Sequence, residues 1–253
     1  MPAPKGDQPG NPTKKLVLLI SCYNEAEAIS SVITAVPVDQ LRRLGVETSV
    51  CVIDNNSSDN TAELARAAGA TVIHEPQPGK GNAMRTGFRS LPSDTDLVAM
   101  IDGDDTYDPT ELLRMVEPLL SGFADVVIGS RLGGRIREGA LNPVNRFGNW
   151  MFTFLTRVGY RANTTDVLTG YFAWKKPVID QLHPVLVSAG FAIEMEMVTK
   201  MARMGWTITS VPISYHPRLG ESSLHPVRDG ARIWWMGTKN LTWRPTAGTD
   251  VSR

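Results

Sequence analysis

The stretch DLVAMIDGDDTYDP, residues 96–109, joins an apolar run directly to an acidic turn. Residues 96–101 are typical of a buried strand, and this strand runs into four carboxylates, Asp102, Asp104, Asp105 and Asp108. Crowded carboxylates repel one another, so packing alone gives no reason to collect them. Either they lie in water as an ordinary turn, or a positively charged group belongs among them.

Similar apolar runs alternate with helical stretches through the first half of the chain. The apolar runs cover residues 16–21, 48–54, 70–74, 96–101 and 125–130, and the helical stretches 25–36, 61–68, 81–91 and 109–120. Runs that are apolar throughout and alternate with helices indicate a parallel sheet covered on both faces. The sequence therefore predicts a single α/β domain with a Rossmann-like, mostly parallel sheet.

The second half of the chain is less regular. We expect a helix at 145–158, a strand at 166–176, a helix at 191–205, a strand at 206–217 and a last helix at 227–243. No linker rich in Pro, Gly and Ser divides the two halves, so we expect one domain with two functional parts.

The composition narrows the class of protein. The 253 residues hold 26 basic and 26 acidic side chains, and this balance argues against a nucleic-acid partner. Cys22 and Cys51 lie in apolar runs, which predicts small buried core residues in a reducing compartment. No apolar window approaches the roughly 20 residues of a membrane span. The first 15 residues lack the apolar segment of a signal peptide.

Polar residues follow four of the predicted strands, where ligands of such sheets bind. They are residues 21–25, 54–59, 102–104 and 129–131. Gly103 allows a tight turn, so Asp102 and Asp104 can converge, and converging carboxylates suit Mg²⁺ or Mn²⁺ together with a diphosphate. The chain has neither a Gly-x-Gly-x-x-Gly after the first strand nor a Walker A loop, which argues against dinucleotide oxidoreductases and P-loop NTPases.

Several stretches of the sequence resemble those of a known family. The stretches SCYNEAEAI, VIDNNSSDNTAELA, GKGNAMRTGF, MIDGDDTYDP, IGSRLGG, NRFGN, DVLTGYFAWKK, GFAIEMEM and VPISYHPRLGESSL run in order from about residue 16 to 230. Together they resemble family 2 glycosyltransferases with a GT-A fold, and among these the dolichyl- and polyprenyl-phosphate mannose or glucose synthases. Two positions depart from the family pattern, Ser21 in place of Pro and Thr106 in place of Gln.

The resemblance implies roles for particular residues. Those for the nucleotide sugar are Ser21, Tyr23, Glu25, Asp54, Asn55, Lys80 and Asp102. Asp102 and Asp104 would hold the metal, and Asp104, Asp105 and Arg131 would be catalytic. Arg131, Arg146, Arg218 and Ser222 would surround an anionic acceptor phosphate.

The implied reaction moves a sugar, with inversion, from a nucleotide diphosphate sugar to a polyprenyl phosphate. A UDP-sugar is favoured as donor over GDP-mannose. A phosphate acceptor is ionised at neutral pH and needs no general base, whereas a hydroxyl acceptor would need one. The carboxylates available for that task are Asp105, Asp166, Glu194 and Glu196. Two alternatives stay open, the same donor chemistry on a soluble acceptor and a non-catalytic nucleotide-sugar-binding protein.

Composition and the resemblance together divide the chain. We expect a disordered lead at 1–14, a glycosyltransferase domain at 15–230, an amphipathic helix at 227–243 and a tail at 244–253. Within the domain, residues 15–130 would bind the nucleotide sugar and 131–230 the acceptor. The expected location is cytoplasmic or peripheral on the cytoplasmic face of the membrane, through direct contact or through a membrane-anchored partner subunit.

Several of these residues also have simpler interpretations. Asp54 could cap the helix that follows it, but Ser57, Ser58 and Asp59 can do so, and we favour the site. Asp108 before Pro109 is typical of a helix cap.

Two further features of the second half have alternative interpretations. Glu194 and Glu196 cannot share a helix face, so we expect one of them at the solvated surface. The stripe Phe147, Trp150, Met151 and Phe154 is either core packing or an apolar surface at the acceptor mouth.

Overall fold

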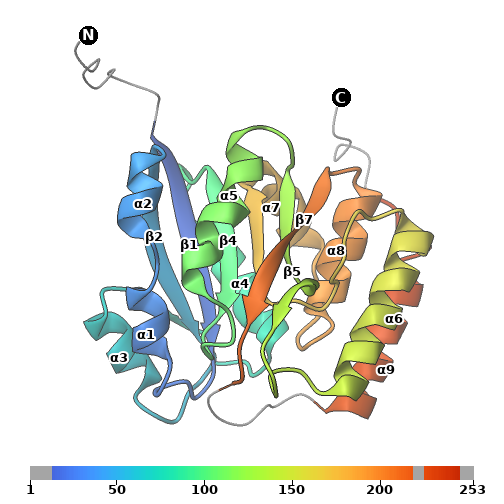
Figure 1. Ribbon diagram of the computed structural model, residues 1–253, viewed down its shortest axis with the longest axis horizontal. Coiled ribbons are helices and arrows are strands. Elements are labelled where there is room, and N and C mark those ends of the chain that lie inside the picture. The colour runs from blue at the N-terminus through green and yellow to red at the C-terminus, as the bar shows by residue number, and fades with distance from the viewer. Residues whose placement is uncertain (1–12, 219–224, 246–253) are drawn as a thin grey trace, which may run out of the picture.

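In the residues that the computed structural model describes, 13–218 and 225–245, seven strands form one sheet in the order β3-β2-β1-β4-β6-β5-β7 (Figure 1). The strands are β1 Lys14–Cys22, β2 Val46–Asp54, β3 Thr71–His74, β4 Leu97–Asp102, β5 Val126–Ile136, β6 Phe172–Lys175 and β7 Ile208–Tyr215. All neighbours are parallel except β6, which is antiparallel to both β4 and β5. The predicted mostly parallel sheet is confirmed.

Helices connect these strands and cover both faces of the sheet (Figure 1). They are α1 Ile29–Thr34, α2 Val38–Arg43, α3 Thr61–Ala67, α4 Lys80–Arg89, α5 Leu112–Leu120, α6 Pro143–Tyr160, α7 Lys176–Leu182, α8 Ile193–Arg203 and α9 Pro226–Lys239, with 3₁₀ turns at Pro109–Glu111 and His183–Val185. Asp108 caps the first 3₁₀ turn by accepting a hydrogen bond from the Thr110 amide, as predicted.

Two hydrophobic cores lie on opposite faces of the sheet because alternate residues of each strand point to opposite sides. In β1, Leu19 belongs to the core under α4, α7 and α8, while Leu18 and Ile20 belong to the core under α1, α3 and α5. The strands therefore read as continuous apolar runs, since both of their faces are buried. Cys22 and Cys51 are free and buried, as expected.

The structure differs from the predicted elements at several boundaries. The first helix begins at Ile29 rather than at residue 25, and it is preceded by a turn in which the Glu25 carbonyl accepts the amides of Ala28 and Ile29. Of the predicted strand 166–176, only Phe172–Lys175 joins the sheet. The short helices α2 and α7 were not predicted.

The sheet reverses its direction of growth at β1, which lies between β2 and β4. The register places Cys22 opposite Asp54 on one side and Ser21 opposite Asp102 on the other. This is the topological switch point of the sheet, where open α/β sheets bind their ligands.

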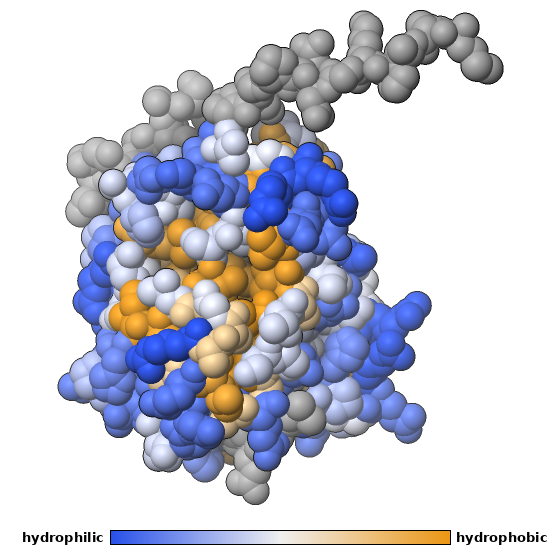
Figure 2. All heavy atoms as spheres, turned by 90° about the vertical axis from the view of Figure 1, so that its left-hand side faces the viewer, coloured by the Kyte–Doolittle hydropathy of each residue, from blue (hydrophilic) through white to orange (hydrophobic). Residues whose placement is uncertain are grey.

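The two ends of the sheet present different surfaces. At the end near α2 and α3, apolar residues gather in the middle of a mainly hydrophilic side (Figure 2). At the other end, α6 and α9 lie side by side (Figure 1). None of the described helices is both long and apolar enough to cross a membrane.

Candidate active site

Four carboxylates meet around the end of β1. Cys22 is fully buried there, and its pKa is raised well above the ordinary value, first by burial and then by the negative charges of Glu25, Asp102, Asp54 and Asp104. All four charges act on the Cys22 thiol because the switch point brings the ends of β1, β2 and β4 together. The structure thus collects the acidic residues that the sequence singled out.

Lys80 neutralises part of this cluster. Its ammonium lies 2.7 Å from Asp102 Oδ1 and 2.7 Å from Glu194 Oε1, and only 14% of its side chain is exposed. Burial lowers the pKa of Lys80, but the two carboxylates more than reverse this, so the ammonium stays charged. Lys80 therefore links the acidic turn after β4 to the start of α8.

Arg218 closes the other side of the cluster. Its guanidinium binds the Glu25 carboxylate and lies 3.3 Å from Asp104 Oδ2. Burial raises the pKa of Glu25 to about 7, although Arg218 acts in the opposite direction. Arg218 was predicted to bind an acceptor phosphate, and the structure gives it two carboxylate partners.

Glycines let the backbone and the carboxylates approach closely. A Cβ on Gly103 would lie 2.4 Å from Cys22 Sγ, and one on Gly170 would lie 2.1 Å from Asp102 Oδ2. We predicted Gly103 for a tight turn, and the structure adds a steric reason, since no side chain fits beneath the acidic turn. Gly170 forms one wall of the space around Asp102.

The loop before α4 sets the position of Lys80. Gly79 has a φ of 124°, and a Cβ there would clash with the Ala189 carbonyl. Asn55 holds this loop, because its side-chain oxygen accepts the Gly79 amide at 2.7 Å and its amide donates to the Gln77 carbonyl at 2.7 Å. Asn55 thus supports the site through the loop.

Glu196 holds the loop at residues 187–188, on which the start of α4 packs. Its carboxylate is fully buried and accepts the amides of Val187 and Ser188, at 3.0 and 2.8 Å. It also pairs with the buried Lys200 at 2.6 Å. Glu194 is buried as well, so the expectation that one of these two glutamates is solvated was wrong. The two side chains have separate buried partners.

The residues at the acidic turn fit a divalent cation. Asp104 is buried, and its pKa is raised by burial and by the charge of Asp102, so nearby positive charge would stabilise the pair. In the described residues no group of three or more His, Cys, Asp or Glu side chains could hold a metal ion on its own. The fit is to an open site of two carboxylates, which diphosphate oxygens would complete.

Arg131 has contacts that differ from the predicted ones. Its guanidinium is buried and forks onto Asp166 at 2.8 and 2.9 Å, and it also donates to the Leu168 carbonyl. Asn149 of α6 donates to the same Asp166 carboxylate at 2.7 Å. The fork that was expected to hold an acceptor phosphate is thus used within the protein, because Asp166 is completely buried and needs a counter-ion.

The remaining predicted residues lie as follows. Tyr23 is 52% exposed beside the carboxylates, and Asp54 is buried, with His74 Nδ1 3.2 Å from its Oδ2 atom. Asp105 is half-buried with a φ of 59°, and Arg146 is exposed near the start of α6. The hydroxyl of Ser21 lies 3.4 Å from Asp102 Oδ1, and Ser222 lies outside the described residues.

Sequence reasoning missed three contributors to this site. Glu194 was considered only as a base for a hydroxyl acceptor, and its pairing with Lys80 was not foreseen. Gly170 acts through its close approach to Asp102, which lies far from it in the chain, and no local pattern signals this contact. The partners of Glu196 are near it in the sequence, and its i,i+4 spacing to Lys200 is the signal that could have found the pair.

The comparisons with known proteins agree with this geometry. The family model described as Glycosyl transferase family 2 matches residues 17–182. The chain belongs to glycosyl transferase family 2. This match covers β1 to α7 and so includes the whole acidic turn.

Three relatives indicate the branch of family 2. Glycosyltransferase AglJ of Haloferax volcanii is 38% identical over 230 residues, which cover 88% of this chain and 71% of the relative. The dolichyl-phosphate hexose transferase of the same organism is 34% identical over 86% of this chain and 90% of its own. The undecaprenyl-phosphate mannosyltransferase of Micrococcus luteus is 30% identical over 83% and 87%. The chain therefore resembles transferases of the polyprenyl-phosphate sugar type.

Solved structures support the fold. Glucosyl-3-phosphoglycerate synthase from Mycobacterium tuberculosis superposes with a TM-score of 0.72 at 21% identity, over 93% of this chain and 82% of that protein. The same enzyme has been solved with Mn²⁺, UDP-glucose and phosphoglyceric acid. At this identity the likeness shows the GT-A fold alone.

Proposed function

We propose that this family 2 glycosyltransferase moves a hexose, with inversion, from a nucleotide diphosphate sugar to a polyprenyl phosphate. The observation that carries the proposal is the cluster of carboxylates at the switch point, which includes Lys80 and Arg218 as its internal cations. The names of the relatives support the acceptor class. We favour a UDP-sugar as donor, with GDP-mannose as the alternative.

The donor would lie across the ends of β1, β2 and β4. Tyr23 would pack on the base, while Glu25 and Asp54 would bind base and ribose hydroxyls. Asp102 and Asp104 would hold Mg²⁺ or Mn²⁺, which acts as a Lewis acid on the charge growing on the leaving diphosphate. Lys80, whose ammonium pairs with Asp102, would also interact with the diphosphate.

The acceptor phosphate would approach from the side of Arg218 and Arg146, together with Ser222. A guanidinium suits a phosphate because its fork matches two oxygens at once. Arg131 would act through its ion pair with Asp166, which would hold the acceptor side of the site in place. Asp105 would lie beside the reacting groups without removing a proton, since the acceptor is already ionised.

A soluble hydroxyl acceptor is the second candidate, and one observation favours it. Two of the four carboxylates considered as bases are fully buried and paired, Asp166 with Arg131 and Glu196 with Lys200. Glu194 is also buried and paired, but its partner is Lys80 and it lies within the influence of Asp102, at the site itself. It could serve as the base that a hydroxyl nucleophile requires.

A matrix of donors and acceptors tests the proposal. UDP-glucose, UDP-N-acetylglucosamine and GDP-mannose would each be offered with a short-chain polyprenyl phosphate and with water-soluble hydroxyl acceptors, with Mg²⁺ or Mn²⁺. We expect transfer to the polyprenyl phosphate. Transfer only to hydroxyl acceptors would replace the proposal by the second candidate. Donor binding without any transfer would indicate a non-catalytic binding protein.

Variants at two residues, Arg218 and Glu194, separate the acceptor classes. For a phosphate acceptor, Arg218→Ala should raise the KM for acceptor at least tenfold, Arg218→Lys should restore it in part, and Glu194→Gln should leave the shape of the pH–rate profile unchanged. For a hydroxyl acceptor, Glu194→Gln should lower kcat by the 10²–10⁴-fold typical of a lost general base. Arg85→Ala, at a half-buried arginine of α4 on no predicted site, is the matched control.

A further inference from the structure

Two helices at one end of the sheet expose a large apolar face. We define the α6–α9 face by its exposed apolar side chains, which are Val144, Phe147, Trp150, Phe154 and Val158 of α6 and Val227, Trp234 and Trp235 of α9. The α6 members follow a spacing of three or four residues, so they share one side of that helix. Contiguous apolar patches of this kind mark contact sites in soluble domains.

The aromatic residues of α6 form an ordered row at the surface. Phe147 stacks on Trp150 with ring centroids 5.9 Å apart, and Trp150 stacks on Phe154 at 6.0 Å. Each of the three side chains is more than half exposed, at 64%, 56% and 53%. The sequence left open whether this stripe is core or surface, and the structure assigns it to the surface.

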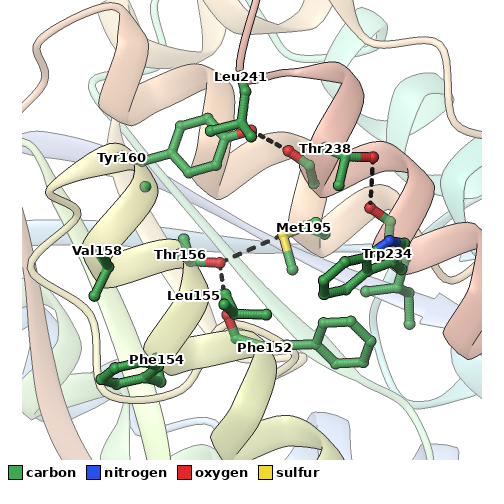
Figure 3. Close-up of a pocket in the computed structure, with 13 residues that line it drawn as sticks. Phe152, Phe154, Leu155, Thr156, Val158, Tyr160, Met195, Trp234, Thr238 and Leu241 are labelled. Carbon is green, nitrogen blue, oxygen red and sulfur yellow. Dashed lines mark hydrogen bonds between the residues drawn. The ribbon is translucent and has the colours of Figure 1, made fainter.

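A cavity continues the apolar face between the two helices. It has a volume of about 220 Å³ and is lined by Phe152, Leu155, Met195, Ile233, Trp234 and Leu241, among others (Figure 3). The Tyr160 hydroxyl donates to the Gly237 carbonyl and so ties α6 to α9 beside this cavity. The face is therefore one surface built by two helices rather than two separate stripes.

The exposed charges on these helices have one sign. Their exposed ionised side chains are basic and comprise Arg146, Arg157, Arg161, Arg228, Arg232 and Lys239. The single acidic residue in 143–161 and 225–244 is Asp229, which is 2% exposed and lies within 3.6 Å of Arg228 and 3.5 Å of Arg232. Exposed aromatic residues bordered by arginines suit an anionic lipid interface, because the rings enter the headgroup region while the arginines meet phosphates.

The α6–α9 face is also connected to the candidate active site. Asn149, on the buried side of α6, donates to Asp166, which holds Arg131. Arg146, a predicted acceptor residue, precedes Phe147 of the face. If α6 docks on a surface, the acceptor side of the site will therefore lie close to that surface.

We propose that the α6–α9 face docks on the surface of an anionic lipid bilayer, with its aromatic side chains in the interfacial region and its basic residues on lipid phosphates. The purpose of this docking rests on the proposed function, since it would bring the site to a membrane-bound polyprenyl phosphate. The docking itself depends only on the face and its charge.

Vesicle sedimentation tests the docking with the full chain and no polyprenyl phosphate. We expect binding to phosphatidylcholine vesicles that contain about 30% phosphatidylglycerol and much weaker binding to pure phosphatidylcholine, since each basic residue near an anionic surface contributes roughly fivefold. Trp150→Ser with Phe154→Ser should weaken binding at least tenfold. Arg157→Gln with Lys239→Gln should weaken it tenfold or more at low salt.

Matched controls lie on other surfaces. Phe123→Ser removes a ring that is 71% exposed before β5, and Arg42→Gln with Arg43→Gln removes two charges from α2. Both controls should bind vesicles like the wild type. The docking is contradicted if anionic vesicles do not bind the protein, or if the controls weaken binding as much as the face variants do. A dimer that the Trp150→Ser, Phe154→Ser variant dissociates in light scattering would also overturn it, since the face would then join two copies.

One further measurement separates this inference from the proposed function. The aromatic double variant should keep full turnover with a short-chain, water-soluble polyprenyl phosphate while it loses turnover on acceptor embedded in vesicles. If no polyprenyl phosphate of any length is glycosylated although anionic vesicles bind the face, the proposed function fails and the docking stands.

Discussion

At the scale of the residue, the site depends on close approach as much as on charge. Gly170 was not singled out in the sequence, yet a Cβ at this position would lie 2.1 Å from Asp102 Oδ2. The carboxylates could be predicted because they follow apolar strands. Their cationic partners Lys80 and Arg218, and Glu194, which shares Lys80 with Asp102, come from three separate segments, and the sequence does not indicate which cation pairs with which anion.

Gly170→Ala tests this packing. The added methyl group would displace Asp102, and a misplacement of about 1 Å can cost roughly 10²-fold in rate. We therefore expect kcat/KM for the donor to fall by one to two orders of magnitude while the protein remains folded. Gly190→Ala is the control, because a Cβ there meets nothing within 4 Å. Equal activities of the two variants in a transfer assay would show that Asp102 is not held by this contact.

Glu25 gives a pH dependence of stability in metal-free protein. Its pKa is about 7 when folded, against an ordinary value of 4.5, so the folded state binds this proton more tightly. The contribution of Glu25 to the unfolding free energy is therefore complete below pH 4.5 and is lost as the pH rises through 7. Urea titrations from pH 4.5 to 8 should show this loss, and Glu25→Gln should flatten it. An unchanged slope in the variant would contradict the raised pKa.

At the scale of the element, periodicity predicted most strands and helices, because both faces of the sheet are covered and its strands are apolar throughout. It failed where specific side-chain contacts, rather than the local pattern, determine the structure. Residues 166–171 look like a strand but carry Asp166 and the walls of the site, and only Phe172–Lys175 enters the sheet. Glu196 was read as one of two surface candidates, although loop 187–188 and Lys200 bury it.

Glu196→Gln tests how α8 supports the start of α4. The change leaves Lys200 charged and unpaired in the interior, and breaking a buried pair typically costs about 3–5 kcal/mol. We expect a loss of this size in urea unfolding, together with a raised donor KM, because the loop at 187–189 holds the helix of Lys80. Adding Lys200→Met should recover much of the stability. If the double variant is no more stable than Glu196→Gln, the pair does not explain the effect.

At the scale of the whole molecule, the switch point of the sheet collects negative charge at one edge, and α6 and α9 collect basic and aromatic side chains at one end. The first of these could be predicted from the polar residues that follow the predicted parallel strands. The second could be predicted only as two amphipathic helices, since their packing side by side is a tertiary fact. The division of the domain at residue 130 into a donor half and an acceptor half stays a prediction.

Binding of the free nucleoside diphosphate tests the central claim most directly, that the carboxylate cluster takes a divalent cation together with a diphosphate. Calorimetry would compare UDP and GDP, each with Mn²⁺ and with EDTA, for the wild type and for Asp104→Asn. We predict that Mn²⁺ strengthens binding of one nucleotide at least tenfold in the wild type and has no effect in the folded variant. Equally tight binding in EDTA, or a Mn²⁺ effect that survives in Asp104→Asn, would contradict the claim.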